Sequence, residues 1–343
     1  MKLLFIVPKL YYGGAELQMR HIINYGIEKG YKIEVVDIET TEELKEKYKV
    51  IQLKKEIFLK KDNKIKKILK RIQLYFLLKK MIDSKKYDYI IFFNILFLPL
   101  VYLVKTKVIF SVREYNMNYF KNYNKYLRKV FIITANNIPS YIELKKKYKR
   151  VFLQNNCVIN FDAEKEKEKL EKTYLIVSNI AKHKNILPVI TLFKQLENKG
   201  YRLRIAGKIT DEKYYKELLK ESIGSNNIRF LGSLNYEKLK EEYLKVAGVI
   251  HLSKQEGTPN ALLDAIKYNK KFICLNTVEN NCLFAEVPIF LINDENELKE
   301  RIYELENYDC SNELKYLQNK IKQMFSERNI IEFYKILKQY KEK

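Results

Sequence analysis

Short apolar runs recur along the chain and alternate with segments in which apolar residues follow a helical spacing. The runs lie at 2–7, 33–37, 89–93, 107–112, 130–134, 174–178, 202–206, 228–231, 248–252 and 271–275. Continuous apolar runs are typical of strands buried on both faces, and their alternation with helices indicates parallel, doubly wound sheets. Such sheets bind ligands beyond the carboxyl ends of their strands. The pattern therefore predicts an α/β protein whose functional loops follow its strands.

The length of the chain favours two domains. At 343 residues and 47% hydrophobic content, the chain can form a core in each of two domains and exceeds a comfortable single core. The charged stretch 162–169 is the best linker candidate, although a short exposed helix has the same composition. We therefore expect an N-terminal domain over 1–160, a second over 161–325, and a terminal helix with an apolar stripe over 326–343.

Residues 253–264 carry the most informative chemistry. They follow an apolar run and read as the start of a helix, with Thr258 as N-cap and Pro259 at the first helical position. Amides in the first turn of a helix suit a phosphate, and Glu256 and Asp264 lie on either side of that turn. Carboxylates accept hydrogen bonds from hydroxyl groups, so the segment suits a sugar nucleotide. An ordinary capped helix with an exposed acid is the alternative.

This segment resembles the signature of the retaining glycosyltransferases with the GT-B architecture, Ser-x-x-Glu-Gly-x-x-x-x-x-x-Glu-Ala. The resemblance implies that Glu256 contacts the donor sugar and that Asp264, in place of the family's Glu, contacts the ribose hydroxyls. It also implies that amides after the glycine hold the sugar and diphosphate, at Gly257, Thr258, Asn260, Ala261 and Leu262.

Two further loops resemble the same family. Gly13 and Gly14 open Gly-Gly-Ala-Glu, which in the family lies near the diphosphate and the acceptor. In the second half, Lys184 matches a lysine that neutralises the leaving diphosphate, whereas Asn179 stands where the family has Arg. An uncharged amide leaves the phosphate clamp to Lys184, helped by Lys182. Taken alone, Lys184 would be an ordinary solvated lysine.

Two softer matches complete the set of candidate site residues. The strand that ends at Gly207 corresponds to the family's nucleotide-binding region. Arg113 follows the apolar run 107–112, where the family has a basic or polar residue that faces the cleft. A surface or ion-paired structural arginine is an equal alternative for Arg113.

The resemblance implies two Rossmann-like domains that face a cleft, with the last helix crossing back to the N-terminal domain. The first domain would bind the acceptor and the second the nucleotide sugar. It implies retaining transfer of a hexosyl or N-acetylhexosaminyl group from a donor expected to be UDP-linked, without a metal ion. The acceptor would be a glycan or lipid-linked oligosaccharide in bacterial capsule, lipopolysaccharide or O-antigen synthesis. A catalytically impaired GT-B scaffold, a basic polyanion-binding protein and a GT-B epimerase or phosphorylase remain alternatives.

The net charge of +23 raises the question of polyanionic partners. Residues 54–86 hold thirteen Lys or Arg against three acids, interleaved with apolar residues. Such a helix suits an anionic membrane surface, and a core-packed helix with a solvated lysine face explains it equally well. We find no nucleic-acid-binding motif and expect no nucleic-acid partner.

The remaining features bear on the compartment. The run between Lys86 and Lys105 is interrupted by polar residues and a proline, so it predicts a buried strand and a short helix rather than a membrane span. The apolar run at 2–7 is too short for a secretory signal, so we expect a cytoplasmic protein, peripheral on the inner face of the membrane if it binds lipid. The four cysteines fit reduced core residues, and the three histidines, His21, His183 and His251, form no metal motif.

Overall fold

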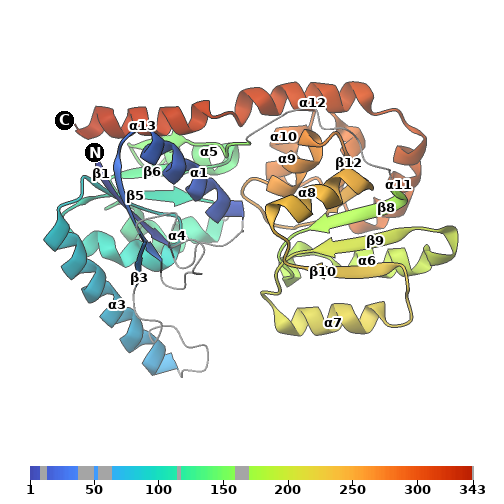
Figure 1. The fold of residues 1–343 in the computed structure, drawn as a ribbon, viewed down its shortest axis with the longest axis horizontal. Coiled ribbons are helices and arrows are strands. Elements are labelled where there is room, and N and C mark those ends of the chain that lie inside the picture. The colour runs from blue at the N-terminus through green and yellow to red at the C-terminus, as the bar shows by residue number, and fades with distance from the viewer. Residues whose placement is uncertain (8–13, 38–49, 53–63, 114–116, 159–169, 342–343) are drawn as a thin grey trace. The chain divides into compact units, whose positions relative to one another are not determined.

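The computed structural model describes residues 1–7, 14–37, 50–52, 64–113, 117–158 and 170–341 (Figure 1). The chain divides into two compact units. Unit 1 comprises Met1–Cys157 together with Glu327–Lys343, and unit 2 comprises Val158–Ser326. The expected linker at 162–169 lies outside the described residues.

Unit 1 is built on a parallel sheet of seven strands in the order β3-β2-β1-β4-β5-β6-β7. Its strands are β1 Lys2–Val7, β2 Lys32–Asp37, β3 Val50–Gln52, β4 Tyr89–Phe92, β5 Lys107–Val112, β6 Ile132–Ala135 and β7 Val151–Leu153. Its helices are α1 Gly14–Glu28, α3 Lys64–Lys85, the 3₁₀ helix η2 Ile95–Tyr102, α4 Met117–Leu127, α5 Ile138–Lys145 and α13 Arg328–Lys341.

Both faces of this sheet are buried, which explains the continuous apolar runs. Along β1, Leu3 and Phe5 join one core cluster with residues of α1 and α13, whereas Leu4 and Ile6 join another with residues of α3. Successive side chains of a strand point to opposite faces, so a strand covered on both sides must be apolar at every position.

The last helix, α13, packs in unit 1 although it ends the chain. The Tyr334 hydroxyl donates a hydrogen bond to the carbonyl of Ile22 over 2.8 Å, and the Tyr89 hydroxyl donates to that of Leu337 over 2.9 Å. A Cβ atom at Gly26 would lie 2.0 Å from the Tyr334 hydroxyl oxygen, so the glycine makes room for this contact. The expected return of the terminal helix to the N-terminal part of the chain is confirmed.

Unit 2 contains a second parallel sheet, in the order β10-β9-β8-β11-β12-β13. Its strands are β8 Leu170–Val177, β9 Arg202–Ala206, β10 Ile228–Gly232, β11 Val246–His251, β12 Lys271–Leu275 and β13 Leu291–Ile292. Its α-helices are α6 Leu187–Gln195, α7 Glu212–Ser222, α8 Tyr236–Lys245, α9 Asn260–Lys267, α10 Val278–Phe284, α11 Leu298–Asn307 and α12 Ser311–Met324. Short 3₁₀ helices are η3 Lys182–Lys184, η4 Glu197–Lys199, η5 Pro288–Phe290 and η6 Glu295–Glu297.

The apolar run between Lys86 and Lys105 forms the buried strand β4 and the short helix η2, as its polar interruptions predict. The Asn94 side chain accepts a hydrogen bond from the Leu96 amide and so begins η2. Across the described part of the chain, no helix combines the length and the apolar character needed to cross a membrane.

The cysteines depart from expectation at one position. Cys157, Cys274 and Cys310 are free thiols in the core, as predicted. Cys282 is also free but exposed, because it lies on the outer side of α10. The expectation that all four are core residues is therefore wrong for Cys282.

Candidate functional site

The candidate site of unit 2 lies where two central strands end. β8 and β11 are neighbours in the sheet, but the chain continues from β8 to β9 on one side and from β11 to β12 on the other. Their following loops therefore diverge at a topological switch point, the usual ligand position in such sheets. The Lys254 amide donates to the carbonyl of His183 over 2.9 Å and ties the two loops together.

Glu256 lies at the junction of these loops and faces two basic side chains. Its Oε1 is 2.5 Å from Lys184 Nζ and 3.2 Å from His251 Nε2. The exposed fractions are only 13% for the Lys184 side chain, 16% for that of Glu256 and 5% for that of His251. Burial alone would raise the pKa of Glu256, but His251 and Lys184 outweigh it and lower that pKa to about 2. Glu256 is therefore ionised at neutral pH.

His251 is the member of this cluster that the sequence did not indicate. It is the last residue of β11 and pairs in register with Cys274 of β12. A polar residue at the end of an otherwise apolar strand was the available signal. Its contact with Glu256 depends on how the following loop turns back, which the Ser253 hydroxyl helps to fix by donating to the carbonyl of Gln255 over 3.0 Å.

The helix after this loop begins one residue later than predicted. α9 starts at Asn260, and its N-cap is Pro259, not Thr258. Pro259 has φ −76°, which a helix accepts, but its ψ of 82° lies outside the helical region.

Two of the backbone amides expected to bind an anion donate hydrogen bonds within the turn itself. The Asn260 amide donates to the carbonyl of Thr258, and the Leu262 amide donates to that of Pro259, both over 2.9 Å. Ala261 supplies the remaining amide of this turn. The Leu262 side chain is fully buried in the core of unit 2, so any contact with a ligand would be through its backbone. Gly257 is buried in the same loop.

Asp264 is partly buried on α9, about one turn after the helix begins at Asn260. Burial raises its pKa to about 6, against the opposing effect of Lys267. Its negative charge also contributes to raising the pKa of Tyr243, mainly a result of burial, and the hydroxyl of Tyr243 donates to the carbonyl of Ala261 over 3.0 Å. Asp264 thus lies in a poorly hydrated environment in which a hydrogen-bond donor from a ligand would stabilise its ionised form.

Asn179 and Gly207 lie in adjacent loops of the same sheet edge. Asn179 is exposed in the loop after β8, which also carries Lys184. A Cβ atom at Gly207 would lie 1.7 Å from the carbonyl oxygen of Ser178, so the glycine lets the loops after β8 and β9 pack backbone to backbone. Gly207 therefore has a structural role whatever it contributes to binding.

Arg113 and Gly14 belong to unit 1. Gly14 opens α1, and Gly13 lies outside the described residues. Arg113 follows β5; its Nη1 donates to Asn156 Oδ1 over 2.9 Å, and its guanidinium lies 4.0 Å from the Phe93 ring centre. Burial lowers its pKa to about 9 despite the opposing charge of Glu16. Arg113 is thus a packed residue at the carboxyl edge of its sheet, not a solvated surface arginine.

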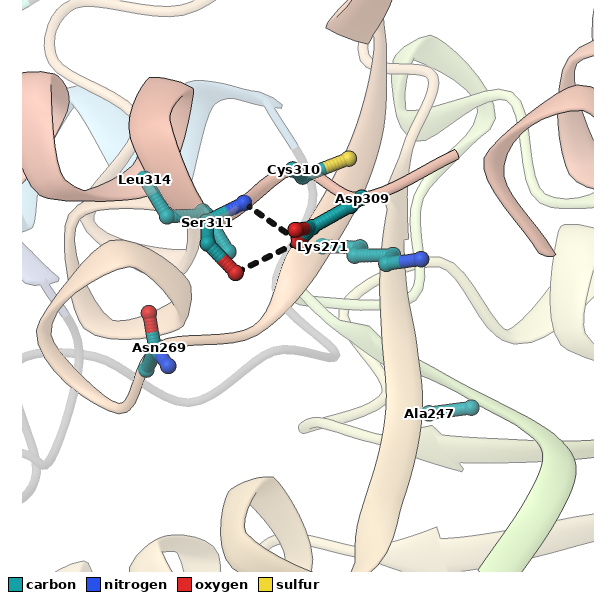
Figure 2. A pocket seen from close by; sticks show the side chains of 7 residues that line it. All are labelled: Ala247, Asn269, Lys271, Asp309, Cys310, Ser311 and Leu314. Atoms are coloured by element: carbon teal, nitrogen blue, oxygen red, sulfur yellow. Dashed lines mark hydrogen bonds between the residues drawn. The ribbon is translucent and has the colours of Figure 1, made fainter. Parts of the chain in front are cut away.

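A separate pocket lies at the opposite edge of the sheet in unit 2. Figure 2 shows Asp309 accepting hydrogen bonds from the amide and hydroxyl of Ser311, over 3.0 and 2.5 Å, beside Lys271. Ala247 and Lys271 line this pocket and stand near the amino ends of β11 and β12. The pocket is therefore distinct from the site around Glu256, which follows the carboxyl end of β11.

Comparison with known families finds a match that covers most of unit 2. The family model described as "Glycosyl transferases group 1" matches residues 159–324, which include β8, β11 and the loops that follow them. A search of curated proteins finds no match.

Solved structures share the fold over nearly the whole chain at low sequence identity. A glycosyltransferase from Rickettsia africae has 17% identity and a TM-score of 0.74, with 98% of each chain covered. Anabaena Alr3699/HepE, solved with UDP and glucose, has 14% identity and a TM-score of 0.75, with 98% of this chain and 99% of that chain covered. TarM from S. aureus, solved with UDP, has 11% identity and a TM-score of 0.76, with 98% of this chain and 99% of that chain covered. These similarities show that the two-unit architecture is that of the GT-B fold.

Proposed function

Residues 159–324 place this chain among the group 1 glycosyltransferases, and on that premise we propose that it transfers a sugar from a nucleoside diphosphate sugar with retention of configuration. The observation that carries the proposal is the buried cluster of Lys184, Glu256 and His251, at the switch point of the matched region. A buried, ionised carboxylate beside a lysine supplies both an acceptor for sugar hydroxyls and a cation for phosphate oxygens.

The proposed reaction breaks the bond between the anomeric carbon and the diphosphate oxygen, which keeps the electron pair. The acceptor hydroxyl enters on the same face and gives its proton to the departing phosphate. Lys184 has three N–H donors, so it can hold Glu256 and still stabilise the leaving oxygens. Glu256 orients the sugar by accepting hydrogen bonds from its hydroxyl groups. We propose that unit 1 binds the acceptor and that Arg113 supplies a further basic group for the reaction.

The nucleotide contacts follow the same chemistry. We propose that Asp264 accepts hydrogen bonds from the ribose hydroxyls, and that the diphosphate meets the backbone at Gly257, Thr258 and the first turn of α9. Asn179 would donate a hydrogen bond to the diphosphate. Gly13, Gly14 and Gly207 are proposed as places where the backbone approaches the donor closely.

We infer that UDP is the nucleotide of the donor, since HepE, TarM and the pneumococcal O-GlcNAc transferase GtfA were each solved with UDP. We propose that the transferred group is a hexose or an N-acetylhexosamine. We propose a glycan or lipid-linked oligosaccharide of bacterial surface polysaccharide as acceptor. WaaG, a similar structure, is named for lipopolysaccharide biosynthesis, whereas sucrose-phosphate synthase shares the same fold, so the acceptor must be tested directly.

A catalytically impaired GT-B scaffold that binds polyanions is the second candidate. It is favoured by the uncharged Asn179 and by the two first-turn amides of α9 that bond within the turn. The net charge of +23 would then attract the polyanion. This candidate predicts no specific nucleotide binding.

Thermal unfolding with UDP, GDP, ADP, CMP and their sugars separates the two candidates. We expect UDP to raise the melting temperature of the wild type by several degrees, because a ligand that binds only the folded state stabilises it. Lys184→Ala and Asp264→Ala should lose the shift. Lys320→Ala is the matched control, since Lys320 is 17% exposed and pairs with Glu286 over 2.7 Å in the same unit.

The same preparations allow the chemical step to be measured. Glu256→Gln should keep nucleotide binding and lose roughly a hundredfold or more in turnover of the donor sugar, as for loss of a group that acts on the transition state. Activity should persist in the presence of EDTA. Wild-type turnover in Glu256→Gln, or no shift with any nucleotide, would remove the proposed function and favour the scaffold.

A further inference from the structure

Helix α3 of unit 1 carries two apolar stripes. The first consists of Leu74, Leu78 and Ile82, which are fully buried against the sheet. Residues four apart lie on the same face of a helix, so this stripe anchors the carboxyl-terminal half of α3. The Tyr75 hydroxyl adds a hydrogen bond to the carbonyl of Leu96 over 2.7 Å.

The second stripe is exposed. Ile68, Ile72 and Phe76 repeat at the same spacing, with Leu69 beside them, and are between 44% and 61% exposed. With 3.6 residues per turn, this stripe lies roughly a third of the way around the helix from the buried one. Core packing therefore explains one stripe of α3 and leaves the other unexplained.

Exposed apolar side chains are concentrated on this helix. Five of the fifteen large apolar side chains that are exposed among the described residues lie on α3, the fifth being Leu77. Single exposed apolar residues are normal in folded proteins, whereas a contiguous group marks an interaction surface.

The charges of α3 indicate the partner. The helix has eight Lys or Arg and one acid, Asp83, which pairs with Lys79. Arg71 lies three residues after Ile68 and Lys80 four residues after Phe76, so by helical spacing both exposed cations lie beside the exposed stripe. Apolar residues flanked by lysines can enter the acyl boundary of a bilayer while the ammonium groups meet anionic headgroups.

We propose that the exposed face of α3, Ile68 to Lys80, docks this chain on an anionic membrane surface. A second copy of the chain is a poor occupant, because two such helices would oppose like charges. A nucleic acid would satisfy the lysines but would leave the apolar stripe exposed. This inference is independent of the chemistry proposed for unit 2.

The absence of tryptophan from the chain makes a direct test available. Phe76→Trp places a single fluorophore in the stripe, and Ile223→Trp places one at an exposed apolar position of unit 2 as the matched control. With phosphatidylglycerol-containing vesicles, we expect a blue shift for Phe76→Trp and none for Ile223→Trp. Vesicles of phosphatidylcholine alone should give neither shift, and added salt should weaken the response.

Vesicle cosedimentation of otherwise native chains completes the test. The double variant Ile72→Ser with Phe76→Ser should bind anionic vesicles at least about tenfold more weakly, because it removes two inserting side chains. Ile223→Ser should bind like the wild type, and circular dichroism should show all variants folded. Equal binding to both lipid compositions, no binding, or a dimer in analytical ultracentrifugation that these substitutions abolish would each overturn the proposal.

Discussion

Glu256 and Asp264 are two carboxyl groups of one loop and helix whose pKa values move in opposite directions. Glu256 faces Lys184 and His251, which outweigh the effect of burial and lower its pKa to about 2. Burial outweighs the charge of Lys267 at Asp264, so the pKa of Asp264 rises to about 6. Surroundings that move the pKa values of two carboxyl groups apart in this way suit the two groups to different roles.

Asp264 should lower the stability of the free protein at neutral pH. Its folded pKa exceeds the ordinary value of 3.8, so the folded state binds the proton more tightly and unfolding becomes easier as the pH rises from about 4 to about 6. Asp264→Asn should therefore raise the free energy of unfolding above pH 6 by up to about 3 kcal/mol and leave it unchanged below pH 4. Urea denaturation at several pH values measures this difference.

In the same experiment, Glu256→Gln should change the free energy of unfolding in the opposite direction. The pKa of Glu256 is lowered from 4.5, so its contribution to stability is present above pH 4.5 and is lost as the pH falls toward 2. The Gln variant should be less stable than the wild type at neutral pH. A stability of Asp264→Asn equal to that of the wild type at pH 8 would contradict the environment described for Asp264.

Among the elements, the loops after β8, β9 and β11 carry the candidate site, and their backbones pack closely. Gly207 is essential to this packing, because an added Cβ would meet the Ser178 carbonyl oxygen at 1.7 Å and both loops directly follow the paired strands β8 and β9.

Gly207→Ala should lower the free energy of unfolding by about 2–3 kcal/mol, the usual effect of overpacking a rigid contact. It should also weaken nucleotide binding, since the loop that carries Asn179 and Lys184 would shift. Gly248→Ala is the control: its nearest contact would be Tyr174 Cε1 at 3.0 Å, so we expect a smaller loss. Urea denaturation and UDP titration of both variants give the comparison; equal losses would contradict the assignment.

The apolar pattern predicted the ten strands that form most of both sheets, because strands buried on both faces must be apolar throughout. It missed β3, β7 and β13, which have only two or three residues each and lie at sheet edges, where burial imposes little pattern. The juxtaposition of Lys184 and Glu256 was predictable, since both follow strands at one edge. The contact of His251 and the start of α9 were not, because both depend on the conformation of a single loop.

At the scale of the molecule, each unit has its own core, but unit 1 is discontinuous. Four buried residues of α13, Ile330, Phe333, Tyr334 and Leu337, complete its core. At about 1.5–3 kcal/mol for each buried side chain, they contribute as much as the whole stability of a typical domain.

A chain that ends at Ser326 should therefore lose the fold of unit 1 and keep that of unit 2. We expect limited proteolysis to degrade residues 1–157 and to leave a resistant fragment beginning near residue 158. UDP should protect that fragment further if it retains the nucleotide site. Full resistance of residues 1–157 after the truncation would show that α13 is dispensable for the core of unit 1.

The dependence of unit 1 on α13 also sets an order for biosynthesis. The ribosome makes residues 1–157 first, yet the helix that completes their core is made only after the whole of unit 2. Unit 2 is continuous and can fold while translation proceeds. The apolar surface of residues 1–157 therefore stays exposed until α13 has been made, so this part of the nascent chain has the greatest need of a chaperone.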